Sequence, residues 1–214
     1  NIMECSSQML ESLQFKMGAV WRPENLPHSQ LPLCEEVGLK HGRIHEVQGL
    51  SSDGFAFSII AKAGGDAVWI GKRDVIYSLS PLAIRRYFSP SRLTCALCLN
   101  RKESLWAAEQ ALRSGGFETV VLQLRNGPNL EESRRLQLAA ETGGSLGLII
   151  IDQNAQSSAC QTRWQCDPIA SNDSELLSPL WRWTLTKNKE GQLGSWRVLR
   201  RKDDHATGHV VMVS

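Results

Sequence analysis

The sequence lacks the features that mark membrane, secreted and polyanion-binding chains. No apolar run approaches the roughly 20 residues of a membrane-spanning helix, and the first residues show no signal-peptide pattern. The net charge of +2 is too small to imply a polyanionic partner by itself. Six cysteines in 214 residues are too dilute for a fold held together by disulfides. These absences, with 42% hydrophobic and 21% charged residues, predict a globular protein of a reducing cytoplasm.

One cysteine pair has a suggestive spacing, Cys95-x-x-Cys98. It lies in residues 92–99, which have the composition of a strand, where residues three apart point to opposite faces. No second close pair and no histidine at zinc-ligand spacing accompanies it. We expect core thiols, with a metal or redox pair as the alternative.

The stretch 100–124 is predicted to hold a capped helix followed by a buried strand. Asn100 and Glu103 have the spacing of a capping box, which satisfies the first free amides of a helix. A pair of glycines then ends the helix, because glycine accepts the left-handed conformation found there. The helical period predicts an apolar face at Leu105, Ala108 and Leu112, and an outer face at Glu109, Gln110 and Arg113. Trp106 is expected in the core, as is Trp69.

The strand that follows this helix lacks an acid. Residues 117–124 form a short apolar run rich in β-branched residues, as in a strand covered on both faces. In a nucleotide hydrolase of this layout, such a strand would end in a carboxylate that holds Mg²⁺. Here Gln123 replaces the strand-end acid.

Strands alternate with helices along the middle of the chain, which favours an α/β fold with a mostly parallel sheet flanked by helices. Strands are predicted at residues 43–47, 67–70, 93–99, 117–124 and 145–151, and helices at 55–63, 74–88 in part, 100–114 and 129–140. Two later strands, residues 181–186 and 195–200, form a C-terminal β-hairpin. We expect an N-terminal arm at 1–40, a core at 41–152, a C-terminal extension at 153–201 and a tail at 202–214.

A phosphate-loop outline is present without its chemistry. Gly49 and Gly54 have the glycine spacing of G-x-x-x-x-G-K-[ST], and they stand between a predicted strand and a predicted helix. However, Phe55 occupies the lysine position, and Ala56 replaces the hydroxyl that would bind Mg²⁺. Asp53 adds a negative charge where the phosphates would lie.

These losses are large enough to predict that the protein is not an enzyme. One missing charge-assisted hydrogen bond costs roughly 1.5–3 kcal/mol, or about tenfold to a hundredfold in affinity. Both protein anchors of the metal are also missing, and phosphoryl transfer depends on positioning and charge neutralisation. We therefore predict a degenerate nucleotide site without a cofactor. Weak nucleotide binding through backbone amides is the alternative.

The C-terminal hairpin is rich in basic residues. Strand alternation places Trp181, Trp183 and Leu185 on one face and Arg182 on the other. The apolar face is expected to pack on the domain, while the basic face either contacts DNA or an acidic partner or is a solvated edge protected by charge. The candidate contact residues are Arg182, Lys187, Lys189, Arg197, Arg200 and Arg201.

Several segments resemble the ImuA family of bacterial RecA-like proteins, which is related to the cell-division inhibitor SulA. Residues 104–116 and 134–144 are similar to the two signature helices of that family. Residues 38–47 resemble the entry into its first core strand, and residues 162–164 and 183–196 resemble its C-terminal hairpin. Residues 187–191 depart from the arginine- and glycine-rich turn of the family, which weakens a DNA-contact role for this loop.

The resemblance implies a RecA-like P-loop-type core that does not turn over ATP. It also implies a cytoplasmic, nucleoid-associated bacterial protein of SOS-induced, error-prone translesion DNA synthesis. The implied partners are ImuB, a degenerate Y-family polymerase homologue, with RecA and an error-prone C-family DNA polymerase as further candidates. Weak DNA contact is possible within this role, and no membrane contact is implied.

Two other functions are alternatives. A SulA-like inhibitor would bind the tubulin-like division protein, but the basic hairpin and the ImuA-type C-terminus favour the lesion-bypass role. An ordinary ATPase would show turnover with single-stranded DNA, which we do not expect. A metal site in the tail is a minor alternative, formed by Asp203, Asp204, His205 and His209.

Overall fold

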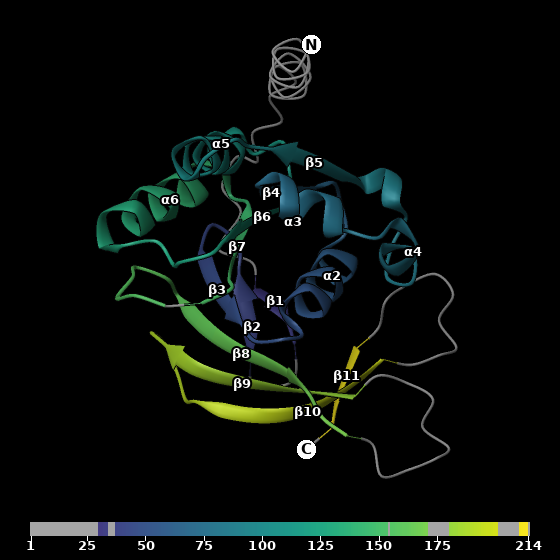
Figure 1. Cartoon of the computed structure of the whole chain (residues 1–214). Coiled ribbons are helices and arrows are strands. Elements are labelled where there is room, and N and C mark those ends of the chain that lie inside the picture. Colours follow the sequence, from purple (N-terminus) through teal and green to yellow (C-terminus); the bar gives the residue numbers. More distant parts are fainter. Residues whose placement is uncertain (1–29, 34–36, 154, 171–179, 201–209, 214) are drawn as a thin grey trace.

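The computed structural model describes residues 30–33, 37–153, 155–170, 180–200 and 210–213. Within them, nine strands form one sheet in the order β11-β10-β9-β8-β3-β7-β6-β4-β5 (Figure 1). The parallel part consists of β3 (Ile44–Gln48), β4 (Ala67–Gly71), β5 (Leu93–Leu97), β6 (Thr119–Leu124), β7 (Leu146–Ile151) and β8 (Thr162–Pro168). Antiparallel strands then extend the sheet beyond β8: β9 (Leu180–Asn188), β10 (Gly194–Arg200) and β11 (Val210–Val213).

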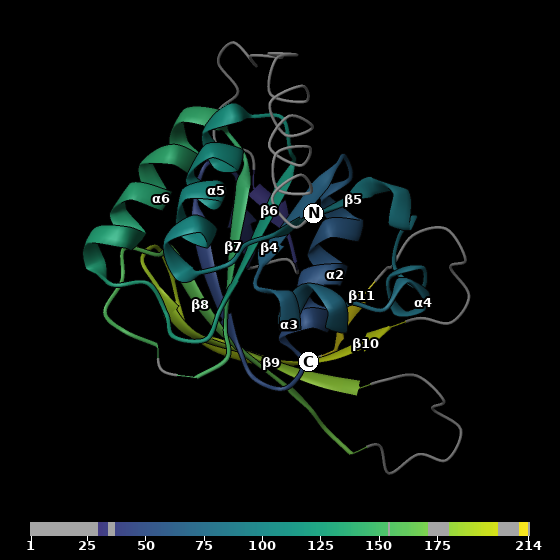
Figure 2. The same cartoon turned by 45° about the horizontal axis from the view of Figure 1, so that its top comes forward.

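Helices cover both faces of the parallel strands. One layer contains α2 (Ser52–Ala63), α3 (Arg73–Ser78) and α4 (Pro81–Ile84), followed by the short 3₁₀ helix η1 (Pro90–Arg92). The other contains α5 (Arg101–Ser114) and α6 (Leu130–Gly143), which lie side by side in both views (Figures 1 and 2). The predicted α/β fold, with a mostly parallel sheet flanked by helices, is confirmed. The C-terminal hairpin is confirmed as β9 and β10.

The two faces of the sheet bury separate apolar clusters. The cluster beneath α2 is rich in aromatic side chains, namely Phe55, Phe57, Trp69, Trp164 and Trp183. The cluster beneath α5 and α6 is aliphatic, with Ala108, Leu112 and Leu136 packed over Val120 and Ile149. Every residue of β7 is buried, as expected for the most apolar strand of the chain.

Local signals set the ends of α5 and α6 as predicted. The Asn100 side chain accepts a hydrogen bond from the Glu103 amide, while Glu103 accepts one from the Leu99 amide. At α6, Asn129 and Glu132 form a complete reciprocal capping box. Both helices end at a glycine in the left-handed conformation.

The glycines at these ends also allow α5 and α6 to meet. A Cβ atom on Gly143 would lie 2.0 Å from the Leu112 carbonyl oxygen. A Cβ on Gly115, which has a φ of 65°, would lie 2.8 Å from the Gly143 carbonyl oxygen. The two helix C-termini therefore approach backbone to backbone, and a larger residue at position 143 would separate them.

The predicted faces of α5 were wrong at two positions. Glu109 was expected on the outer face but is buried, because α6 packs against α5 and brings Arg135 to its carboxylate. Trp106 was expected in the core but is 49% exposed. In the α5 helix, Trp106 points away from the face that Ala108 and Leu112 bury on the sheet. Trp69 is fully buried, as predicted.

The described part of residues 1–40 is a small hairpin, formed by β1 (Gln30–Pro32) and β2 (Gly38–Lys40). An extended arm was expected here. Leu31 and Leu39 are buried in the cluster beneath α2, which explains why this segment is ordered against the domain. Residues 1–29 and the histidine-containing segment 203–209 lie outside the described residues.

The cysteines that the structure describes are free thiols: Cys95, Cys98, Cys160 and Cys166. Burial raises the pKa of each, most strongly that of Cys166. Their thiolate forms, which react with oxidants and bind metals, are therefore disfavoured. In the described part of the chain, no group of three or more His, Cys, Asp or Glu side chains could hold a metal ion. No helix of this part is long and apolar enough to cross a membrane.

Candidate functional site at the carboxyl edge of the sheet

The turn after β3 is shorter than the phosphate loop predicted at residues 49–54. Only Gly49, Leu50 and Ser51 separate the strand from α2, which begins at Ser52. Asp53 and Gly54 consequently lie in the first helical turn and not in a loop. The predicted loop was too long, because an isolated glycine such as Gly54 is tolerated inside a helix and does not mark the end of the turn.

The amides of this short turn are paired with protein atoms. The Leu50 amide donates to Asp167 Oδ1 at 3.3 Å, and the Ser51 amide donates to the Cys166 carbonyl at 3.0 Å. Gly49 has a φ of 100°, and a Cβ there would lie 2.3 Å from the Cys166 carbonyl oxygen. The end of β8 thus covers the turn. It accepts hydrogen bonds from backbone amides that, in a phosphate loop, would bind the phosphate.

The charge around the turn is negative. Burial raises the pKa of Asp53, and the nearby Asp152 raises it further. Asp167 adds its carboxylate on the other side of the turn, where it also accepts hydrogen bonds from Gln165 Nε2. A phosphate at this place would meet carboxylates in place of a lysine and a metal ion.

Gln123 uses both ends of its side-chain amide. Its Oε1 accepts a hydrogen bond from Trp69 Nε1 at 3.2 Å, and its Nε2 donates to Asp152 Oδ1 at 3.1 Å. A carboxylate at this position could accept from Trp69 but would repel Asp152. Gln123 therefore connects β6 to both neighbouring strands, which explains an amide where a hydrolase would carry an acid.

Phe55 and Ala56 point into the protein. Both are completely buried. The Phe55 ring centroid lies 4.6 Å from that of Trp183 and 5.6 Å from that of Trp164. The residue at the predicted lysine position is thus an aromatic anchor that joins α2 to β8 and β9.

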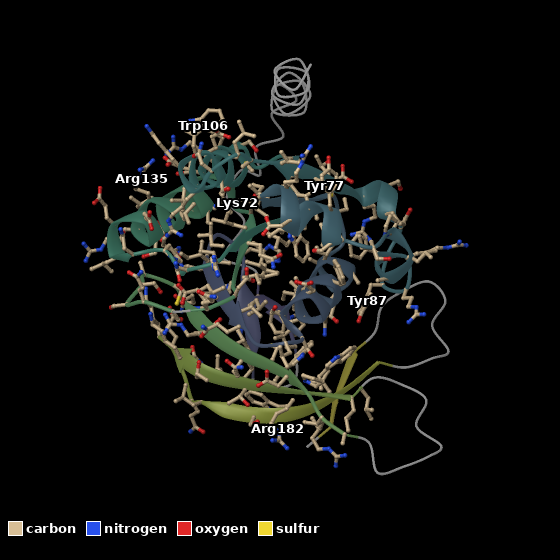
Figure 3. All side chains as sticks on the ribbon, in the orientation of Figure 1. Lys72, Tyr77, Tyr87, Trp106, Arg135 and Arg182 are labelled. Atoms are coloured by element: carbon tan, nitrogen blue, oxygen red, sulfur yellow. The ribbon has the colours of Figure 1, made fainter. Side chains whose placement is uncertain are left out.

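The two faces of the hairpin are as predicted. Trp181, Trp183 and Leu185 are buried, while Arg182 is exposed. Arg182 is the cross-strand partner of Arg197, which is also exposed. Figure 3 shows Arg182 on the outer side of the sheet, away from the helices. The structure brings these two predicted contact residues together.

Two of the predicted contact residues bind their own chain. Lys187 Nζ donates to the Ser158 carbonyl at 2.7 Å, and Lys189 Nζ donates to the Ala159 carbonyl at 2.7 Å. These lysines hold the segment before β8 against the hairpin. The Arg200 side chain and all of Arg201 lie outside the part that the structure describes, so their contact role stays a prediction.

No local pattern in the sequence indicates that Asp152 or Asp167 belongs to this site. Asp167 lies more than 100 positions after Gly49, and only the pairing of β3 with β8 brings the two together. The buried ion pair of Glu46 with Arg163 was also missed, with Arg163 Nε donating to Glu46 Oε2 at 2.7 Å. It fixes the same pair of strands from the face of the sheet that also carries Asp167. A strand that pairs in parallel with a strand far away in the sequence produces no local sequence pattern that would reveal the pairing.

Together these features define an α/β protein with a central, mostly parallel sheet and a strand–turn–helix unit that its own backbone closes. No family model matches the sequence. Among curated proteins, the chain is similar to Protein ImuA of two Caulobacter vibrioides strains, NA1000/CB15N and ATCC 19089/CB15. Identity is 26% over 204 residues, covering 83% of this chain and 82% of the relative. The comparison confirms the resemblance to ImuA noted in the sequence.

Proposed function

We propose that the chain is a non-catalytic accessory protein of SOS-induced, error-prone translesion DNA synthesis. The observation that carries this proposal is the closed turn after β3, in which Asp167 and the Cys166 carbonyl bind the amides of Leu50 and Ser51. Because these amides are already bound, the turn fits a protein that docks partners better than one that hydrolyses nucleotides. The similarity to Protein ImuA supplies the biological context.

The proposed core is RecA-like. The first strand of the parallel set, β3, lies inside the sheet and leads through a glycine turn into α2, which is the layout of a P-loop fold. The strand beside β3 in the sheet is β7, which is the last strand in the chain that a helix connects to the strand before it. This arrangement supports a nucleotide-binding ancestor whose ligand position is now used for packing.

The proposed partners are a degenerate Y-family polymerase homologue of the ImuB type, RecA and an error-prone C-family polymerase. The exposed cross-strand pair Arg182 and Arg197 is the part of the hairpin best placed to contact an acidic surface or a nucleic-acid backbone. We propose a cytoplasmic location because these partners act on bacterial DNA.

The test combines nucleotide assays with partner capture. The purified full chain should show no ATP turnover with Mg²⁺ and single-stranded DNA, with RecA as the positive control. It should retain the ImuB-type protein on a column and not the tubulin-like division protein. Turnover that follows the chain through purification, or retention of the division protein alone, would refute the proposed role.

A further inference from the structure

The outer surface of α5 and α6 exposes large apolar side chains that neither helix needs for its packing on the sheet. Trp106 is half exposed on α5, and Leu138 is 60% exposed on α6. Figure 3 shows Trp106 and Arg135 on the side of this layer away from the sheet, and Arg135 binds Glu109, one helical turn after Trp106. Exposed tryptophan beside arginine is the composition enriched at the energetic centres of protein interfaces.

A buried carboxylate holds two arginines on this surface. Glu109, with a side chain only 12% exposed, accepts from Arg113 Nη2 at 2.7 Å and from Arg135 Nη2 at 2.5 Å. The arginine side chains are themselves 50% and 59% exposed. Each guanidinium has five N–H donors, so both keep donors that face solvent. Holding them in advance lowers the entropy that a partner must remove on binding.

The helical period gathers these groups around Trp106. Lys102, Trp106 and Arg113 lie within one narrow stripe of α5, at i, i+4 and i+11. On α6, Leu138 shares the outer stripe with Arg134, four residues before it. Each helix thus presents one exposed apolar side chain that shares its outer stripe with cations.

The charge of this surface selects the partner. Its cations are Lys102, Arg113, Arg134 and Arg135, and its carboxylates are Glu109, Glu131 and Glu141. Glu141 pairs with Arg43, so five cations counting Arg43 face three carboxylates, and the excess is two positive charges. Glu103 is occupied at the helix N-terminus, where it binds the Leu99 amide. Exposed apolar side chains with an excess of only two cations suit an acidic protein segment better than a nucleic-acid backbone, whose binding depends on neutralising many phosphates.

We propose that the outer α5–α6 surface, formed by Lys102, Trp106, Arg113, Arg134, Arg135 and Leu138, docks an acidic protein segment that carries an apolar anchor. The anchor packs on Trp106, and its flanking carboxylates meet Arg113 and Arg135. This docking site rests on the proposed accessory role, because it names the kind of segment that a partner of the protein presents. It is separate from the hairpin residues Arg182 and Arg197.

Fluorescence anisotropy with a defined probe tests the proposal. The probe is a labelled twelve-residue peptide with eight glutamates around a central Leu-Phe-Phe-Leu, and its control replaces every glutamate by glutamine. The full chain should bind the acidic probe, and Trp106→Ala and Arg135→Glu should each weaken binding by at least about tenfold. Leu82→Ala and Arg85→Glu, which alter exposed residues elsewhere, are the matched controls and should change binding less than about twofold.

Each outcome decides the proposal. No binding of the acidic probe, equal affinity for the glutamine control, or equal affinity of the two α5–α6 variants and wild type would overturn it. So would tighter binding of a single-stranded oligonucleotide that the same variants abolish. Arg135→Lys and a thermal melt of each variant separate lost binding from lost folding. If the probe binds as expected while the ImuB-type protein is not retained, the surface stands and the proposed function fails.

Discussion

Restoring the missing lysine of the phosphate loop should unfold the protein before it restores nucleotide binding. Phe55 is completely buried between Trp164 and Trp183, so Phe55→Ala should cost about 3–5 kcal/mol for lost transfer free energy and the cavity left behind. That loss is a large fraction of a typical total of about 5–15 kcal/mol. Phe55→Lys should cost at least as much, because it also places an ammonium group in an aromatic cluster.

Urea denaturation followed by tryptophan fluorescence measures this effect directly, since two indoles pack against the substituted ring. Phe55→Leu is the matched control, and it should cost only about 1–2 kcal/mol because it keeps most of the buried apolar volume. A Phe55→Lys protein with near wild-type stability, or one that binds Mg²⁺-ATP, would refute the reasoning. Either result would mean that position 55 can face the turn instead of the core.

Three further predictions concern His45, Gln123 and the arginine pair of the hairpin. Burial lowers the pKa of His45 from 6.5 to about 4, so the unfolded chain binds a proton that the folded chain excludes between these values. Stability is then fully present above pH 6.5, and about 2 kcal/mol of it should be lost from pH 7.5 to pH 5 in urea titrations; His45→Gln should remove this component, and an unchanged pH profile would contradict it. Gln123→Asp should show no ATP hydrolysis in a phosphate-release assay and should destabilise by about 1–3 kcal/mol, because Asp152 loses its donor; hydrolysis by this variant alone would show a competent phosphate site. Arg182→Glu with Arg197→Glu should weaken partner or DNA capture while the protein stays folded, with a small drop in melting temperature because the carboxylate at position 182 would lie opposite Asp167; full capture would favour a solvated edge.

The sequence predicted those parts of the fold that local signals determine. The capping residues Asn100 and Asn129 and the glycines that follow each helix predicted α5 to within one residue at each end and α6 to within three. The alternation of Trp181, Arg182 and Trp183 fixed the faces of β9. These features depend on neighbours within one or two turns of the chain, so a single sequence contains the information.

The errors have a common physical cause. Trp106 and Glu109 were assigned to the wrong sides of α5 because residue type was weighed above the position of α6, which the sequence does not supply. The extent of the turn after β3 depended on Asp167, which arrives from a strand distant in sequence. Tertiary neighbours override local preference at such places. They are also the places where the candidate site is built.

If the core descends from a nucleotide hydrolase, as we propose, its degeneracy is structural as well as chemical. Substitution of catalytic residues alone would leave an open turn that a few reversions could return to activity. Here the replaced positions have acquired packing roles, because Phe55 anchors α2 to the tryptophans and Gln123 joins Trp69 to Asp152. Asp167 also accepts a hydrogen bond from the Leu50 amide within the turn. Under this proposal, each substitution toward a phosphate-binding residue removes a contact that stabilises the fold, so stability opposes the recovery of nucleotide chemistry.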